Sequence, residues 1–193
     1  MANVNKPFGL RPSGNLSATG AQKQYGYEIA DNQSGAIYQG DLVVVYDGYI
    51  IKYDASTHTA PTGVFNGCQY NDPTRADKPT WKNYYPGSIT PNIGPIVCEV
   101  LDDPSQLFLI QAAGTITQAD IGKNADPTAS TGGSNVTGVS AATLGTPAKT
   151  AALTMKIVGL SEQAGNELGQ YAVVVVKLNQ HQYGSVGVAA DGA

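Results

Sequence analysis

The most constraining feature of the chain is an Asp-Gly dipeptide between two runs of strand-forming residues. Residues 42–46 precede Asp47 and Gly48, and residues 49–53 follow them. This pattern favours a type I′ β-hairpin, whose two turn residues both need a positive φ. With Tyr46 opposite Tyr49, alternation places Leu42, Val44, Tyr46, Tyr49, Ile51 and Tyr53 on one face and Val43, Val45, Ile50 and Lys52 on the other. Both faces are largely apolar, so the hairpin needs packing partners on two sides, as in a β-sandwich or barrel.

Short strand-forming segments separated by turn residues continue along the chain. Further strands are expected at 63–70, 96–101, 106–112, 153–160 and 171–178. This spacing is typical of an all-β fold, either a sandwich or a barrel-like domain. The glycines within 63–70 predict a bulge or a close backbone approach. The four valines at 173–176 predict a strand buried on both faces.

Only one helix is predicted, and it is short. Thr117 and Asp120 stand at capping-box positions, and Gly122 ends the turn. Residues 72–95 contain five prolines with aromatic residues between them and predict a long surface loop. Residues 124–150 are rich in Ala, Thr, Ser and Gly and predict either an irregular loop or a weakly apolar strand such as 136–139.

The N-terminal segment shows no strand or helix period. It contains three isolated large apolar residues, Phe8, Leu10 and Leu16, and predicts an extended arm that docks on its own domain or on a neighbour. We expect an arm at 1–24, a β-domain at 25–183 and a flexible C-terminal tail at 184–193. If the arm is a tether, deleting residues 1–14 should leave the domain folded. A domain of this length buries roughly 70% of its unfolded surface and needs no disulfide or metal.

The ends and the cysteines indicate the cellular setting. The N-terminus lacks the apolar core of a signal peptide. No apolar run reaches the ~18 residues of a membrane span. Synthesis in a cytoplasm, with no membrane partner, is therefore expected. Cys68 and Cys98 form no metal-binding pattern and are expected to be free, buried thiols.

Charge is sparse, at 13% of residues against a typical ~25%. The net charge is −4 and the basic residues are scattered, which argues against nucleic-acid binding. Sparse charge favours a surface partly covered by a partner, although a β-protein solvated by Thr, Ser and Asn has the same composition. Eleven tyrosines favour an interface too, or else fill sheet edges. The candidate interface residues are Phe8, Leu10, Arg11, Trp81, Tyr84 and Tyr85.

No catalytic constellation is recognisable. His58 and His181 are far apart in sequence and are expected to be isolated surface residues. Asp102 and Asp103 are adjacent and followed by Pro104, which predicts a turn rather than a carboxylate pair. No metal-site, phosphate-loop or nucleophile-elbow motif occurs. We therefore assign no catalytic, cofactor-binding or metal-binding residue and expect a protein that is not an enzyme.

Five segments occur in a characteristic order, at residues 7–12, 37–45, 63–70, 106–111 and 117–126. In this order they resemble the capsid decoration (cement) proteins and related small virion proteins encoded beside major capsid genes in tailed bacteriophages. The resemblance implies a β-barrel or sandwich, usually a homotrimer, clamped on the outside of the capsid. It also implies the major capsid protein as partner, a virion location, and a terminal arm that ties capsid subunits together.

Two other functions are compatible with the sequence. One is a different virion component, such as a head-fibre base, a tail protein or a minor capsid protein. The other is a carbohydrate-binding or adhesive β-domain. That function would need exposed aromatic residues in a groove, and residues 81–85 are the place to look for them.

Overall fold

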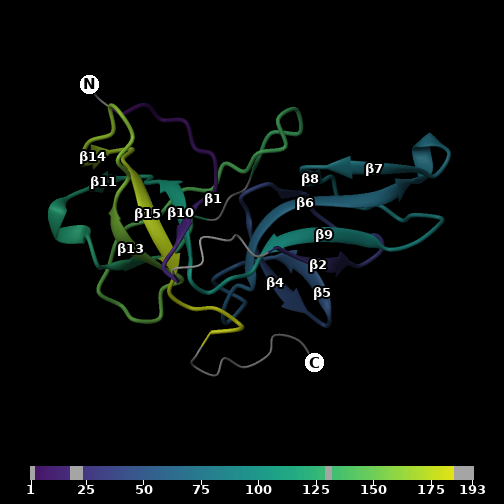
Figure 1. Cartoon of the computed structure of the whole chain (residues 1–193), viewed down its shortest axis with the longest axis horizontal. Coiled ribbons are helices and arrows are strands. Elements are labelled where there is room, and N and C mark those ends of the chain that lie inside the picture. The colour runs from purple at the N-terminus through teal and green to yellow at the C-terminus, as the bar shows by residue number, and fades with distance from the viewer. Residues whose placement is uncertain (1–2, 18–23, 129–131, 185–193) are drawn as a thin grey trace.

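The protein is all-β, as the sequence predicts. The computed structural model describes residues 3–17, 24–128 and 132–184, and the strands form two large antiparallel sheets and two small ones (Figure 1). The five-stranded sheet has the order β1 (Arg11–Asn15), β10 (Gln106–Gln111), β15 (Val173–Leu178), β13 (Met155–Leu160) and β12 (Asn124–Ala125).

The six-stranded sheet forms the other half of the molecule. Its main path is β2 (Gln24–Ile29), β9 (Ile96–Leu101), β6 (Gly63–Asp72), β4 (Leu42–Tyr46) and β5 (Tyr49–Lys52), and β7 (Lys78–Lys82) also pairs with β6. The small sheets pair β3 (Ile37–Tyr38) with β8 (Tyr84–Tyr85), and β11 (Thr115–Ile116) with β14 (Gly169–Gln170).

Two apolar cores cover the two faces of the six-stranded sheet. The first core joins residues of both large sheets, such as Val64 of β6 with Phe108 of β10 and Val174 of β15. The second core lies on the opposite face and includes Phe65 of β6 and Tyr85 of β8. Because β2 and β5 also contact each other, this sheet curls around the second core like part of a barrel.

The hairpin has the predicted register and the predicted two-sided burial. Tyr46 lies opposite Tyr49, and the turn residues Asp47 and Gly48 have φ values of 48° and 84°. Val44 belongs to the first core, whereas Val43 belongs to the second. Alternation along β4 therefore sends consecutive side chains into different cores.

Other local predictions are confirmed. A register shift between Phe65 and Gly67 marks the bulge in β6. The short helix is η2 (Gln118–Asp120), in which the Asp120 carboxylate accepts hydrogen bonds from the backbone N–H and the hydroxyl of Thr117. Cys68 and Cys98 are free and fully buried, and they lie directly opposite each other on β6 and β9.

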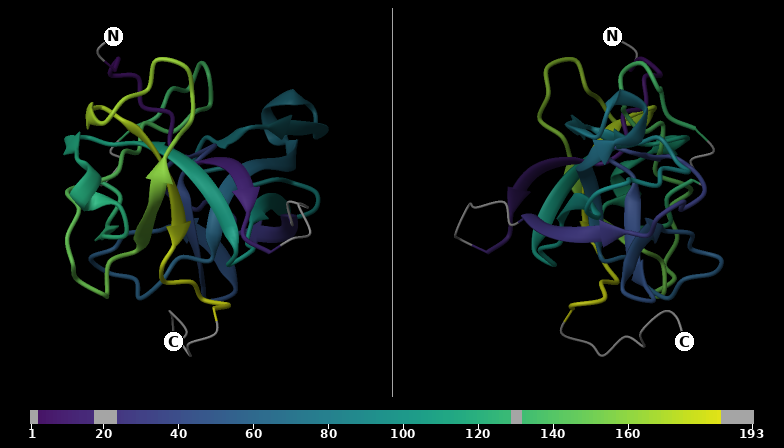
Figure 2. Two further views of the ribbon diagram at one scale, coloured as in Figure 1. Left: turned by 60° about the vertical axis from the view of Figure 1, so that its left-hand side comes forward. Right: turned by 90° about the vertical axis from the view of Figure 1, so that its right-hand side faces the viewer.

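Three predictions are wrong in detail. Residues 72–95 are not one loop, because they contain η1 (Pro73–Arg75), β7 and β8. Along β15, Val174 and Val176 are buried but Val173 and Val175 are only partly buried. The predicted arm contains β1, which pairs with β10 (Figure 2), so it belongs partly to the β-domain. The predicted C-terminal tail lies outside the described residues except for Gly184.

Candidate functional site

The six predicted interface residues do not form one site. Leu10 and Tyr85 are 2% and 0% exposed because they fill the first and the second core, so neither is available to a partner. Phe8 and Tyr84 are partly buried, whereas Arg11 and Trp81 are exposed. The structure brings Phe8 and Arg11 together, with the Arg11 guanidinium carbon 4.6 Å from the Phe8 ring centroid.

The arm is built into its own domain around Gly9 and Leu10. The Leu10 N–H donates a 2.9 Å hydrogen bond to the Gly40 carbonyl, and β1 then adds to the edge of β10. Gly9 has a φ of 68°, and a Cβ there would lie 2.8 Å from the Gly40 oxygen and 2.7 Å from Ser140 Cβ. Only glycine fits such a crossing without strain.

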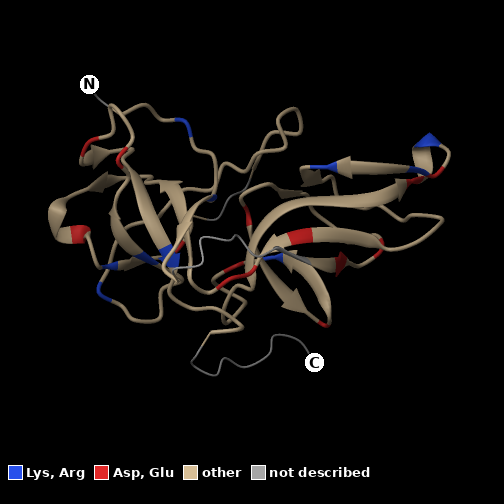
Figure 3. Ribbon diagram, in the orientation of Figure 1, with Lys and Arg blue, Asp and Glu red and all other residues tan. Residues whose placement is uncertain are grey.

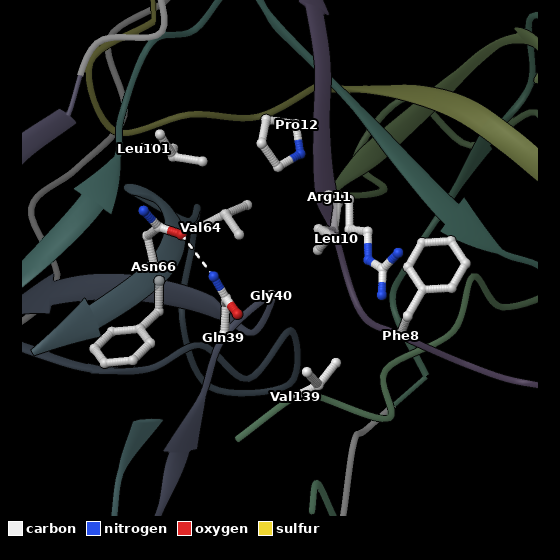
Figure 4. A pocket seen from close by; sticks show the side chains of 11 residues that line it. Phe8, Leu10, Arg11, Pro12, Gln39, Gly40, Val64, Asn66, Leu101 and Val139 are labelled. Carbon is white, nitrogen blue, oxygen red and sulfur yellow. Dashed lines mark hydrogen bonds between the residues drawn. The ribbon is translucent and has the colours of Figure 1, made fainter. Parts of the chain in front are cut away.

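A hollow of about 360 Å3 opens beside the arm, which we call the arm hollow (Figure 4). Its apolar walls include Leu10, Val64 and Leu101. On the polar side, the Gln39 amide donates a 3.0 Å hydrogen bond to Asn66 Oδ1. Arg11 and Phe8 stand at its edge (Figure 4), so the hollow combines apolar walls with a cation and two amides.

Arg11 has no ion-pair partner within the described part of the chain. Acidic residues are few and are spread over both halves of the molecule (Figure 3). A guanidinium that is held over an aromatic ring presents its donors in a fixed fork, which suits a carboxylate. The arm hollow can therefore bind a group that pairs an apolar part with a carboxylate.

A second hollow, of about 390 Å3, lies against the exposed indole of Trp81, which we call the Trp81 hollow. Trp81 is 57% exposed and lies directly opposite Gln69 in the β6–β7 pair. Val97 of β9 also lines it. The two hollows share no lining residue.

Tyr84 belongs to a separate aromatic group. Its ring stacks on Tyr38 at a centroid distance of 5.8 Å, and Lys82 Nζ lies 5.6 Å from its centroid. The Tyr38 hydroxyl in turn donates to Asn135 Oδ1 at 2.6 Å. Tyr84 is thus already engaged within the chain.

The titratable side chains of the described residues are engaged locally or isolated from one another. The Asp41 carboxylate is engaged by Lys52 at 2.8 Å. His58 is partly buried, and its Nδ1 accepts a hydrogen bond from the Asp54 N–H. His181 is only 4% exposed, which corrects the prediction of a surface residue, and its Nδ1 accepts a 3.0 Å hydrogen bond from the Tyr183 N–H. Among the described residues, no group of three or more His, Cys, Asp and Glu side chains could hold a metal ion.

Sequence reasoning found Phe8 and Arg11 but missed Gln39, Asn66 and Val139, which complete the arm hollow. These three residues come from separate segments and carry no local signal.

None of the helices in the described part of the chain is long and apolar enough to cross a membrane. Comparisons with protein-family models, curated proteins and solved structures return no match.

Proposed function

We propose that this protein is a capsid decoration protein of a tailed bacteriophage that binds the outer surface of the major capsid protein and stabilises the particle. The observation that carries the proposal is the arm hollow, where Arg11 has no carboxylate among the described residues and stands beside apolar walls. The resemblance of five sequence segments to such proteins supports the same function.

The occupant that we propose is a segment of the capsid protein with an apolar side chain and a neighbouring carboxylate. The apolar side chain would enter the hollow beside the partly buried Phe8, Pro12 and Val139, and the carboxylate would bind Arg11. Strand β1 and the Gly9 crossing fix the backbone on both sides of Arg11. A rigid site of this kind loses little conformational entropy on binding.

Assembly follows from the same resemblance. We propose a homotrimer on the capsid exterior, made in the host cytoplasm and without contact to packaged nucleic acid. The net charge of −4 supports the last point because a surface against DNA would need clustered cations. Light scattering after size exclusion and on-particle imaging test the trimer separately from the attachment.

The attachment is tested with particles that lack the protein, made from a phage with the gene deleted. Purified full-length protein is added, and bound protein is measured after sedimentation of the particles. A charge-assisted hydrogen bond contributes ~1.5–3 kcal/mol, so Arg11→Glu should weaken binding by at least roughly tenfold. Arg75→Glu, on the exposed η1 turn, is the matched control.

Two results would contradict the proposal. One is that the wild-type protein does not sediment with the particles at any concentration. The other is that Arg11→Glu and Arg75→Glu bind equally well while both stay folded by circular dichroism. The second result would leave capsid binding intact but remove the arm hollow from it.

A further inference from the structure

A row of four side chains crosses the sheet at the Trp81 hollow. Trp81 of β7 lies opposite Gln69 of β6, and Gln69 lies opposite Val97 of β9. Val97 in turn lies opposite Glu28 of β2. Directly opposed residues of antiparallel strands point to the same side of a sheet, so an indole, an amide, a small apolar group and a carboxylate share one surface.

The neighbouring row explains how the indole is held. Gly67 lies opposite Glu99, and a Cβ at Gly67 would lie 2.8 Å from Cζ2 of Trp81. The six-membered ring of Trp81 therefore lies against the Gly67 backbone, where any larger residue would displace it. With 57% of the residue exposed, the ring is a fixed aromatic platform rather than a core side chain.

The polar groups around this platform are available. Within the described residues, the Gln69 amide and the Glu28 and Glu99 carboxylates have no hydrogen-bond or ion-pair partner. Asn71 uses its Nδ2 to donate to the Ile93 carbonyl at 2.8 Å, which leaves its Oδ1 as an acceptor. The donors and acceptors therefore belong to amides and carboxylates, which bind hydroxyl groups well.

We propose that the Trp81 hollow binds a neutral glycan, with one sugar ring stacked on the indole and hydroxyl groups hydrogen-bonded to Gln69 and Asn71, which also line the hollow. The C–H faces of a sugar ring are apolar and its edge is ringed by hydroxyls, which matches a flat aromatic surface beside amides and carboxylates. The two carboxylates disfavour anionic sugars by charge repulsion. This activity goes beyond capsid attachment.

The shape of the site agrees with such a ligand. Its volume of about 390 Å3 lies within the ~300–1,000 Å3 of small-molecule sites. Strands β6 and β7 extend together at the right-hand end of the molecule, away from β1 and the five-stranded sheet (Figure 1). The core of a protein–protein interface is usually depleted of charged residues. Here Glu28 lies in the same cross-strand row as Trp81, and Glu99 lies in the same row as Gly67. This charge favours a glycan over a protein partner.

The chain contains a single tryptophan, so its fluorescence reports on this site alone. The full-length protein is titrated with neutral hexasaccharides of glucose, galactose, mannose and N-acetylglucosamine. A hyaluronan hexasaccharide and hexalysine serve as anionic and cationic probes. We expect a saturable change in Trp81 emission with at least one neutral hexasaccharide and none with hyaluronan.

Variants then locate the binding. Gln69→Ala keeps the fluorophore and should raise the Kd roughly fivefold, the equivalent of one hydrogen bond of ~1 kcal/mol. Gln163→Ala, which removes an exposed glutamine elsewhere, should leave the Kd unchanged. Trp81→Ala should abolish binding in calorimetry while its circular dichroism spectrum stays that of the wild type.

The proposal is overturned if none of the neutral hexasaccharides changes the emission, or if only hexalysine does, which would make the site a receptor for a basic peptide. Equal Kd values for Gln69→Ala and Gln163→Ala would also overturn it. Because these titrations use free protein, their outcome is independent of the sedimentation assay for capsid attachment.

Discussion

The Ser140 hydroxyl donates a 2.5 Å hydrogen bond to the Asp41 carboxylate, and both residues are 1% exposed. The other Asp41 oxygen accepts from the Tyr38 N–H at 2.9 Å and pairs with Lys52 at 2.8 Å. One buried carboxylate thus joins β3, the β4–β5 hairpin and the segment at 139–142. This network lies beside the Gly9 crossing, where Ser140 Cβ approaches the arm.

This relationship predicts a measurable loss of stability in Ser140→Ala. Asp41 would stay buried but lose a donor, which costs ~1–3 kcal/mol of the free energy of unfolding. Urea denaturation followed by circular dichroism measures the change. Ser13→Ala, on the exposed side of β1, is the matched control and should stay close to the wild type. Identical denaturation midpoints for the two variants would show that the bond contributes nothing.

The hairpin register predicts that Val44→Asp unfolds the domain. Val44 is fully buried in the first core, so the aspartate would be desolvated without a partner. The cost of several kcal/mol is comparable with a total stability of ~5–15 kcal/mol. Val136→Asp introduces the same charge at a residue that is 96% exposed. If thermal melts show the same midpoint for both variants, the assignment of Val44 to the core is wrong.

The accuracy of the sequence predictions depends on how local the determining signal is. The hairpin could be predicted because Asp47 and Gly48 set the turn, and the turn fixes the pairing of Tyr46 with Tyr49. Strand β1 could not be predicted, because its partner β10 is distant in sequence and because the residues of β1 show no alternation of apolar and polar side chains. Strand β7 was hidden by Pro79, which is tolerated on an edge strand.

The residues of the candidate sites also differ in whether a local sequence signal or only tertiary packing identifies them. Phe8, Arg11 and Trp81 are unusual residue types in their segments and could be selected from sequence. Their surroundings could not, because Gln39, Asn66 and Val139 reach the arm hollow only through tertiary packing. Leu10 and Tyr85 were misassigned since large apolar side chains suit a core as well as an interface.

The docked arm changes the expected effect of truncating it. Leu10 is 2% exposed within the first core, so Leu10→Ala should cost ~2–5 kcal/mol of the free energy of unfolding. Leu16→Ala, at a position on the same segment that is 57% exposed, should cost little. Urea denaturation compares the two variants. Deleting residues 1–14, expected from sequence to leave the domain folded, should destabilise it because the deletion removes Leu10 and most of β1.

The two thiols should be chemically silent in the folded protein. Burial raises the pKa of Cys68 to about 12 and also raises the pKa of Cys98. Thiolate is the reactive form, so modification by iodoacetamide at pH 8 should be very slow. In guanidinium, both cysteines should react within minutes. Rapid labelling of either cysteine under native conditions, read by mass spectrometry, would contradict their burial.

The pH dependence of stability should report on His181. Burial lowers the pKa of His181 below its ordinary value of 6.5, against the opposing effect of Asp102 and Asp103. Lys177 acts in the same direction as burial. Nδ1 must also be unprotonated, because it accepts a 3.0 Å hydrogen bond from the Tyr183 N–H. Protonation of Nδ1 would break that bond and place a charge in a buried site.

The sign of the effect follows from proton linkage. Below pH 6.5 the unfolded chain binds a proton at His181 before the folded chain does, so acid favours unfolding. The contribution of neutral His181 to the free energy of unfolding is fully present above pH 6.5. It is lost as the pH falls towards the lower pKa that His181 has in the folded state. Melting temperatures between pH 8 and pH 5 should therefore fall more steeply for the wild type than for His181→Gln, which cannot be protonated. His58→Gln, measured alongside, controls for the general loss of a histidine, and equal slopes for the wild type and His181→Gln would contradict this role of His181.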